Sequence, residues 1–316
     1  MRLSTLYMYQ QSAQTMSARM SQSNDVYLRM SAGKTLLKAS DDPAAATDAV
    51  KYQDALAKLE LYSDVRARAR GALEHQDNIL NGVGNLMTTT LKEKLVAAGS
   101  DTYSDEDRRA LGKEIEGIRK NMLDLANNRD GNGRYIFGGF KTDTPPYDDA
   151  GAYQGSDDVR KQIVADGTEM QVGHLGREVF DDIFPILEKA VEELTRDPMD
   201  ETAMKAALSA ASKAVDAGID RLGKVQAEVG TNLQQLDALD MSGDVMINDM
   251  IVKVQTAIGG DIGVLTSLVA ESQMSDLALN ASMYVYKNMQ KMNLFDIGSQ
   301  ESFFLQASAV HGEHPV

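Results

Sequence analysis

The chain contains no cysteine and no tryptophan, and aromatic residues make up only 6% of its 316 residues. Without cysteine it can form no disulfide, no thiolate metal site and no cysteine nucleophile. No stretch approaches the roughly 20 consecutive apolar residues of a transmembrane helix. The N-terminus also lacks the apolar run of a cleaved signal peptide, which by itself predicts a cytoplasmic protein. We therefore expect no membrane insertion.

Basic residues are also few: 32 Lys and Arg stand against 47 Asp and Glu, for a net charge of −15. A general nucleic-acid binder needs a cationic face, so this class is not expected. The four histidines are scattered, and Gly33-Lys34-Thr35 lacks the first glycine of a P-loop because Leu28 stands there. We expect a protein that is not an enzyme, with no catalytic, cofactor-binding or metal-binding residue and no cofactor.

The chain is rich in methionine, with 17, and 43% of its residues are hydrophobic, which favours long helices packed side by side. Near each end, seam residues recur at alternating spacings of three and four, as in a coiled coil. We predict that the two stripes pair as antiparallel arms and supply the subunit and assembly interface. The N-terminal stripe is Leu6, Tyr9, Ala13, Met16, Met20, Ser23, Tyr27 and Met30. The C-terminal stripe is Ala270, Met274, Leu277, Ala281, Val285, Asn288, Met292 and Phe295.

The segment between the arms shows clear helix signals. Asp42 before Pro43 predicts the start of a long helix that ends at Gly99, and Ser104 opens a capping-box start for the next. After a small insert, helices are expected over 181–196, 200–241 and 245–295. The pair Ser242-Gly243 is a possible bend, and Gly259-Gly260 is a weak point.

The insert over 131–180 mixes turn residues with aromatics. Strands are expected over 160–165 and 169–172, joined at Asp166-Gly167, a favoured hairpin turn. The aromatic cluster is interpreted as a small core rather than a binding surface; it comprises Tyr135, Phe137, Phe140, Tyr147 and Tyr153.

The predicted fold class is mainly α: a long antiparallel helical bundle with coiled-coil arms from both termini and a small β-rich inserted domain. Six segments follow. They are an N-terminal arm 1–42 that pairs with 270–297, a rod-like half 43–130, the insert 131–180, a second rod-like half 181–269, the C-terminal arm 270–297 and a tail 298–316.

Several segments together resemble the hook-associated junction proteins of the flagellin family, over nearly the whole chain. The matching motifs are MRLST at 1–5, MSAGK at 30–34, SDDPAAA at 40–46, DGNGRYIFGG at 130–139, GTNL at 230–233 and ASMYVYKNMQKMNL at 281–294. The tail 298–316 departs from the pattern, since members usually end soon after the C-terminal helix.

The resemblance implies a flagellin-like structural subunit of the bacterial flagellum, secreted by type III export and sited at the hook–filament junction. It implies a homo-oligomeric ring whose terminal helices fold as it polymerises, with a neighbouring hook-associated protein and flagellin as partners. It also implies a cytoplasmic export chaperone on the C-terminal arm. The alternatives are a flagellin filament subunit and, from another class, a cytoplasmic helical regulator or chaperone.

Overall fold

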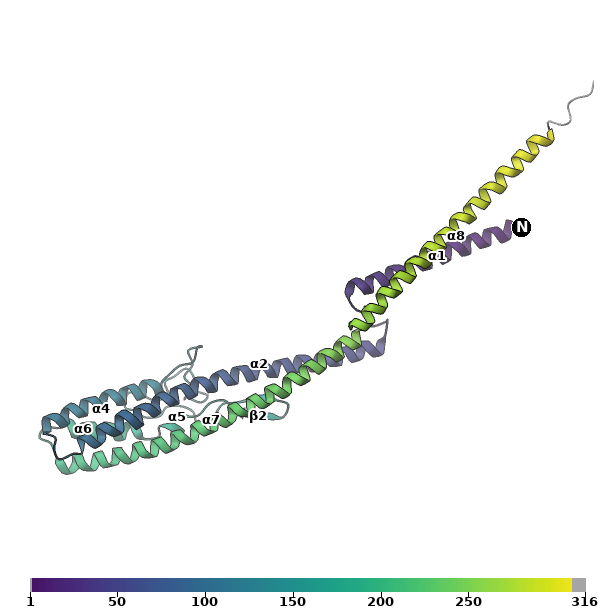
Figure 1. Cartoon of the computed structure of the whole chain (residues 1–316). Helices are drawn as coiled ribbons and strands as arrows, with labels where there is room; N and C mark the ends of the chain where they lie inside the picture. The colour runs from purple at the N-terminus through teal and green to yellow at the C-terminus, as the bar shows by residue number, and fades with distance from the viewer. Residues whose placement is uncertain (1, 309–316) are drawn as a thin grey trace, which may run out of the picture. The chain divides into compact units, whose positions relative to one another are not determined.

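The computed structural model describes residues 2–308, with side chains described over residues 7–290, and divides the chain into two compact units (Figure 1). The terminal unit combines Met1–Leu56 with Asn248–Val316, and the central unit is Ala57–Ile247. No helix within residues 2–308 has both the length and the apolar character that a membrane crossing requires.

The terminal unit is built from helices alone in its described part. It holds α1 (Arg2–Ala32), α8 (Ile262–Ser308), the first turns of α2 (Pro43–Asn85) and the last turns of α7 (Glu201–Ile258). Within the predicted N-terminal arm, the residues that carry the stripe form the single helix α1. α8 begins earlier than the predicted arm at 270 and continues as helix into the segment taken as a tail.

The helix starts follow the capping signals in the sequence. Asp42 Oδ1 accepts hydrogen bonds from the amides of Ala44 and Ala45, both at 3.0 Å, so it caps α2 just before Pro43. Ser104 forms a capping box with Asp107 at the start of α4 (Asp105–Ala126), as predicted. These caps satisfy amides that have no partner inside the first helical turn.

The central unit is a helical bundle with a continuous apolar core. Its helices are α2, η1 (Leu86–Leu91), α3 (Lys92–Ala98), α4, α6 (Ile183–Thr195) and α7. The fully buried side chains of this core include Leu73, Leu80, Met87, Leu91, Ile115, Met122, Leu187 and Leu194. η1 is a π-helical turn, and it keeps both Met87 and Leu91 inside the core, where Met87 lies beside Gly218 of α7.

The bend predicted at Ser242-Gly243 is wrong, because α7 runs unbroken through both residues. Gly243 is buried and its missing side chain makes room for the guanidinium of Arg66 on α2. That guanidinium donates to Asp240 on α7 and to the carbonyl oxygen of Val164 in the insert, the latter at 3.2 Å. Glycine here permits a close approach and not a change of helix direction.

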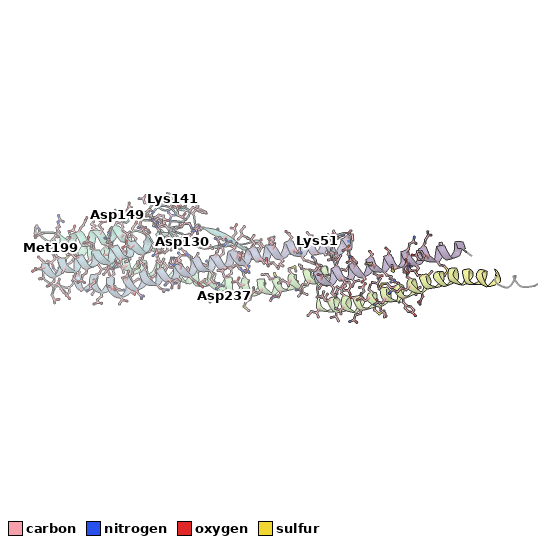
Figure 2. The ribbon with its side chains drawn as sticks, turned by 90° about the horizontal axis from the view of Figure 1, so that it is seen from above. Lys51, Asp130, Lys141, Asp149, Met199 and Asp237 are labelled. Carbon is pink, nitrogen blue, oxygen red and sulfur yellow. The ribbon has the colours of Figure 1, made fainter. Side chains whose placement is uncertain are left out.

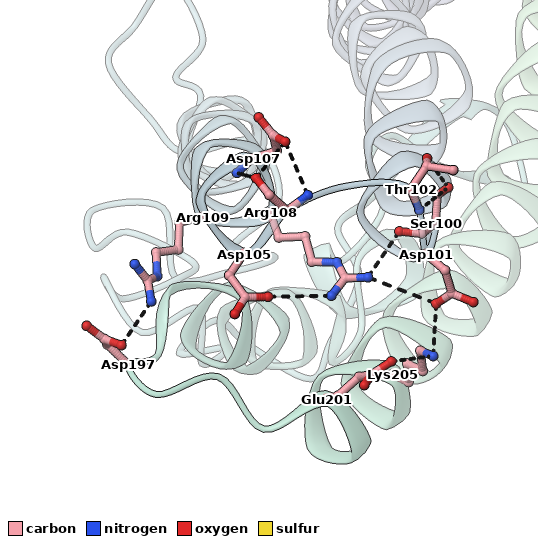
Figure 3. Close-up of polar contacts among 11 residues, drawn as sticks. Ser100, Asp101, Thr102, Asp105, Asp107, Arg108, Arg109, Asp197, Glu201 and Lys205 are labelled. Atoms are coloured by element: carbon pink, nitrogen blue, oxygen red, sulfur yellow. Dashed lines mark hydrogen bonds and ion pairs between the residues drawn. The ribbon is translucent and has the colours of Figure 1, made fainter.

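A buried arginine also ties the α3–α4 turn to the bundle (Figure 3). Arg108 donates from Nη2 to the carbonyl oxygen of Ser100 at 3.1 Å and lies 3.7 Å from Asp105. Asp101 in the same turn pairs with Lys205 of α7 at 3.0 Å. The turn is therefore held from two helices.

The insert contains one hairpin, β1 (Lys161–Ala165) and β2 (Thr168–Gln171), and the short helix α5 (Gly176–Val179). Both strands agree with the predicted pair. Figure 2 shows the labelled insert residues Lys141 and Asp149 along one side of the helices. The two strands account for little of the insert, and most of the rest is turns and irregular backbone.

An aromatic cluster fills the insert and joins it to α6. Tyr147 packs edge-on against Tyr153, Phe180 and Phe184 at ring-centroid distances of 5.1–5.8 Å. Burial raises the pKa of Tyr147, and it raises the pKa of Tyr153 to about 12. The small-core interpretation is confirmed except for Phe140, which is 64% exposed.

The cluster predicts different costs for two glycine substitutions. Gly151 (φ +83°) and Gly167 (φ +70°) both have left-handed backbones, but a Cβ at 151 would overlap Phe184, whereas a Cβ at 167 would meet nothing. We expect Gly167→Ala to cost about 1–2 kcal/mol and Gly151→Ala about 1–3 kcal/mol more, measured by urea unfolding of the central unit. Equal losses would show that the ring cluster is not tightly packed.

Candidate functional site: the paired terminal helices

α1 and α8 lie side by side in antiparallel orientation (Figure 1). Tyr9 near the start of α1 contacts Tyr286 far along α8, with ring centroids 5.3 Å apart and their hydroxyls hydrogen-bonded. Tyr27 near the end of α1 donates to Asp276 Oδ2 at 2.6 Å. The hydrogen bond between the two hydroxyls lowers the pKa of Tyr9, because it stabilises the ionised form of that residue as acceptor. It raises the pKa of Tyr286, because only the neutral form of that residue can donate.

Part of the surface between the two helices is polar. Ser23 of α1 and Ser272 and Ser275 of α8 are buried. Ser23 Oγ donates to Asp276 Oδ1 at 3.3 Å, and Asp276 thus receives two hydroxyls from α1. The hydrogen bond to Asp276 raises the pKa of Tyr27, since ionisation would place two negative charges together. This polar layer fixes which residues meet, as a buried polar residue does in a coiled coil.

The predicted seam of α8 is not the face that meets α1. Ala270 and Ala281 are exposed, and Met274, Leu277 and Val285 are exposed by 68%, 67% and 53%. The expectation that this stripe closes against the N-terminal arm within one chain is therefore wrong. Its role as an interface between subunits stays a prediction.

α8 carries a second stripe with the same alternating spacing, and this one meets α1. Its members are Leu268, Ser272, Ser275, Leu279, Ser282, Tyr286 and Met289, all buried or half-buried. Ser272 and Met274, like Ser275 and Leu277, are two residues apart, which is about 200° around a helix of 3.6 residues per turn, so the two stripes face opposite ways here. The three serines are the signal that could have identified this face, since small side chains let two helices approach closely.

The predicted stripe of α1 is only partly enclosed. Tyr9, Ala13 and Met16 are half-buried, whereas Met20 is 65% exposed and Tyr27 is 43% exposed. Beyond Ser23 the buried position shifts by one residue, from Tyr27 to Val26.

Among the remaining members of the two predicted stripes, Asn288 is exposed. Met30 is 36% exposed. The side chains of Leu6, Met292 and Phe295 lie outside the described residues.

An apolar groove of about 430 Å³ opens between the outer parts of α1 and α8. Tyr7 and Met8 line it from α1, and Ala281, Val285 and Met289 line it from α8. Two of these, Ala281 and Val285, belong to the predicted C-terminal stripe. The groove is an unfilled apolar surface with no cluster of catalytic groups among its described lining residues.

The two units differ sharply in how they bury apolar residues. Among the described side chains of the terminal unit, the buried hydrophobic residues are Val26, Ala49 and Leu268. Nearly all of the extensive core belongs to the central unit. The terminal helices therefore present a large apolar surface that a monomeric soluble protein rarely exposes.

The chain is similar to known proteins over most of its length. Residues 3–142 match the model of the bacterial flagellin N-terminal helical region. The chain is 30% identical over 319 residues to flagellar hook-associated protein 3 of Salmonella typhimurium strain LT2, and 31% identical to the protein of that name from Escherichia coli K12. Each alignment covers 94% of this chain and 99% of the relative.

The chain belongs to the flagellar hook-associated protein 3 family. As a member of this family it is a structural protein of the bacterial flagellum, and the family is not an enzyme family. The resemblance seen in the sequence motifs and the mainly helical fold with a small β insert are both confirmed.

Solved structures share the fold of this family member at lower identity. A putative flagellar hook-associated protein from Vibrio parahaemolyticus aligns with a TM-score of 0.63 and 21% identity, covering 70% of this chain and 99% of its own. FlgL from Bacillus cereus aligns with a TM-score of 0.53 and 24% identity, covering 66% of this chain and 100% of its own.

The polar layer predicts that Asp276→Ala weakens the contact between α1 and α8, because Ser23 and Tyr27 both lose their acceptor. Since the chain has no cysteine, Ser12→Cys with Ser282→Cys, which line the same groove, gives a clean cross-linking assay with a short bis-maleimide. We expect several-fold lower cross-linking yield in Asp276→Ala. Glu271→Ala, at an exposed carboxylate of α8, is the matched control, and equal yields in both would contradict the role of the layer.

Proposed function

We propose that this chain forms the homo-oligomeric ring that joins the hook of the bacterial flagellum to its filament. The supporting observation is the apolar face of α8, which its own chain leaves largely uncovered: Met274, Leu277 and Val285 are all more than half exposed. Completing the burial of these three side chains contributes about 3–6 kcal/mol per subunit, because full burial of one such side chain is worth about 1.5–3 kcal/mol and they are about two-thirds exposed. Neighbouring copies supply the cover, so the ring is held together by its terminal helices.

Folding of the terminal helices is coupled to polymerisation in this proposal. Within one chain, the α1–α8 contact gains little from apolar burial, because its face includes Ser23, Ser272, Ser275 and Asp276. Fixing each backbone residue costs about 1–2 kcal/mol, which such a contact offsets poorly. The arms are frayed in the free subunit and become ordered when neighbours bury their outer faces.

The neighbours in the assembled flagellum are a second hook-associated protein on one side and flagellin on the other. The relatives from Salmonella typhimurium and Escherichia coli are named hook-associated proteins, which supports a position next to the hook. The subunit is secreted and reaches this position by type III export. Before export, a cytoplasmic chaperone covers the C-terminal arm, whose exposed apolar face needs protection.

The coupling of folding to assembly predicts a change in hydrogen exchange. In the free subunit, amides over residues 7–30 and 270–290 should exchange at least tenfold faster than those of the α4 and α6 core helices. In assembled flagella the same segments should become protected. Strong protection of the arms in the free subunit would contradict the proposal.

A charge on the outer face should block assembly without unfolding the chain. We expect Leu277→Asp, or Met20→Asp on α1, to abolish junction formation in cells lacking the native gene, because the new carboxylate would be buried between subunits. The central unit should keep its unfolding temperature. Asn280→Asp adds the same charge beside the stripe and is the control. Normal filaments in the Leu277→Asp strain would show that the apolar face of α8 is not the interface between subunits.

A further inference from the structure

The terminal unit has two linkers: residues 33–42 join α1 to α2, and residues 259–261 join α7 to α8. The helix before each linker ends in the same way. α1 stops just before Gly33 (φ +63°), where the amide of Gly33 donates to the carbonyl of Met30 and that of Lys34 to the carbonyl of Arg29, both at 3.2 Å. α7 stops just before Gly259 (φ +63°), where the amides of Gly259 and Gly260 make the equivalent pair of bonds, at 3.1 and 2.8 Å. Both are Schellman motifs, which stop a helix at a defined residue and set the direction in which the chain leaves.

Each linker also starts the next helix with an aspartate. Asp42 caps α2 as described above, and Asp261 Oδ1 accepts from the amide of Val264 at 2.9 Å at the start of α8. Within the longer linker, Asp41 Oδ2 accepts from the amides of Leu37 and Lys38 at 3.1 and 2.9 Å. Hydrogen bonds from backbone amides, several of them to aspartate carboxylates, therefore fix the conformation of both linkers over most of their length.

The two linkers are bonded to each other. The amides of Thr35 and Leu36 both donate to the carbonyl oxygen of Ile258 at 3.1 Å, and the Thr35 hydroxyl donates to it at 3.4 Å. Ile258 is the last residue of α7, and its carbonyl has no partner within its own helix. Donors from a segment 223 residues away in sequence satisfy it.

The contact is also sterically close. A Cβ added to Gly259 would overlap Thr35 Oγ1, whereas a Cβ added to Gly33 would meet nothing within 4 Å. Because the end of α1 and the end of α7 are joined here, a change of direction in one linker must displace the other. The last turn of α1 and the first turn of α8 are thereby held close to each other.

We propose that the two linkers form one coupled hinge, held by Thr35 and Leu36 on Ile258, which is present in the free subunit and sets the register in which α1 and α8 pair. Thr35 is a positioning residue in this arrangement. The last step, pairing of the arms outward from the hinge during assembly, rests on the proposed function. The hinge itself does not, because its hydrogen bonds form within one chain.

Hydrogen exchange with single-amide resolution on the full-length free subunit tests the hinge. We expect the amides of Thr35 and Leu36 to exchange at least tenfold more slowly than an unstructured peptide, even where the outer parts of α1 and α8 exchange freely. Gly259→Ala should remove this protection. Gly33→Ala, with the same positive φ and no overlap, should reduce it far less, and Gly260→Ala, whose Cβ would make only ordinary contacts, should leave it unchanged.

Three outcomes overturn the coupled hinge: free exchange at Thr35 and Leu36 in the native chain, equal effects of Gly259→Ala and Gly33→Ala, or a Gly259→Ala chain that keeps the protection. Protected linkers together with fully protected arms would support the hinge and contradict only the polymerisation-coupled folding. Junction formation gives the second readout. It should fall at least tenfold in Gly259→Ala and remain normal in Gly260→Ala, with the central unit folded in both.

Discussion

The structure depends on which face α8 turns toward α1. A helix with two stripes at the same spacing can pair through either, and here the pairing uses the stripe with Ser272, Ser275 and Ser282. Small side chains allow close approach and place Asp276 where two hydroxyls of α1 can reach it. The cost is that little apolar surface is removed from water. The consequence is that the apolar face of α8 stays available to another molecule.

The central unit buries its apolar side chains within the chain, whereas the terminal unit leaves them exposed. This difference in burial explains why the chain divides into two units. Its helices bury leucine, methionine and phenylalanine almost completely, and its charged groups are used to hold connections, as Arg66 and Arg108 do. Such a unit contains its own buried core. The terminal unit has polar contacts inside and apolar side chains outside, which is the arrangement expected of a part whose core is completed by its neighbours.

Local signals in the sequence predicted the elements well. The seam periodicity predicted α1, the Ser104 box predicted the start of α4, and Asp166-Gly167 predicted the hairpin, because each signal acts within a few residues. The face of α8 that meets α1 was not predictable by choosing the more apolar stripe, since that choice assumes burial within one chain. Gly243 was misread for a related reason: its partner Arg66 is far away in sequence, and only the fold shows that glycine there provides space.

A polar contact between α1 and α8 has a further consequence for how the arms find each other. Apolar seams gain free energy from many slightly shifted registers, whereas a layer such as Ser23, Tyr27 and Asp276 is satisfied in one. Pairing that is satisfied in one register is selective, but α1 and α8 would find that register slowly if both helices moved freely. The bond from Thr35 to Ile258 removes most of that search, because it brings the hinge ends of both helices to one point and reduces the loop entropy of closure. Selectivity from the polar layer and proximity from the linkers thus complement each other.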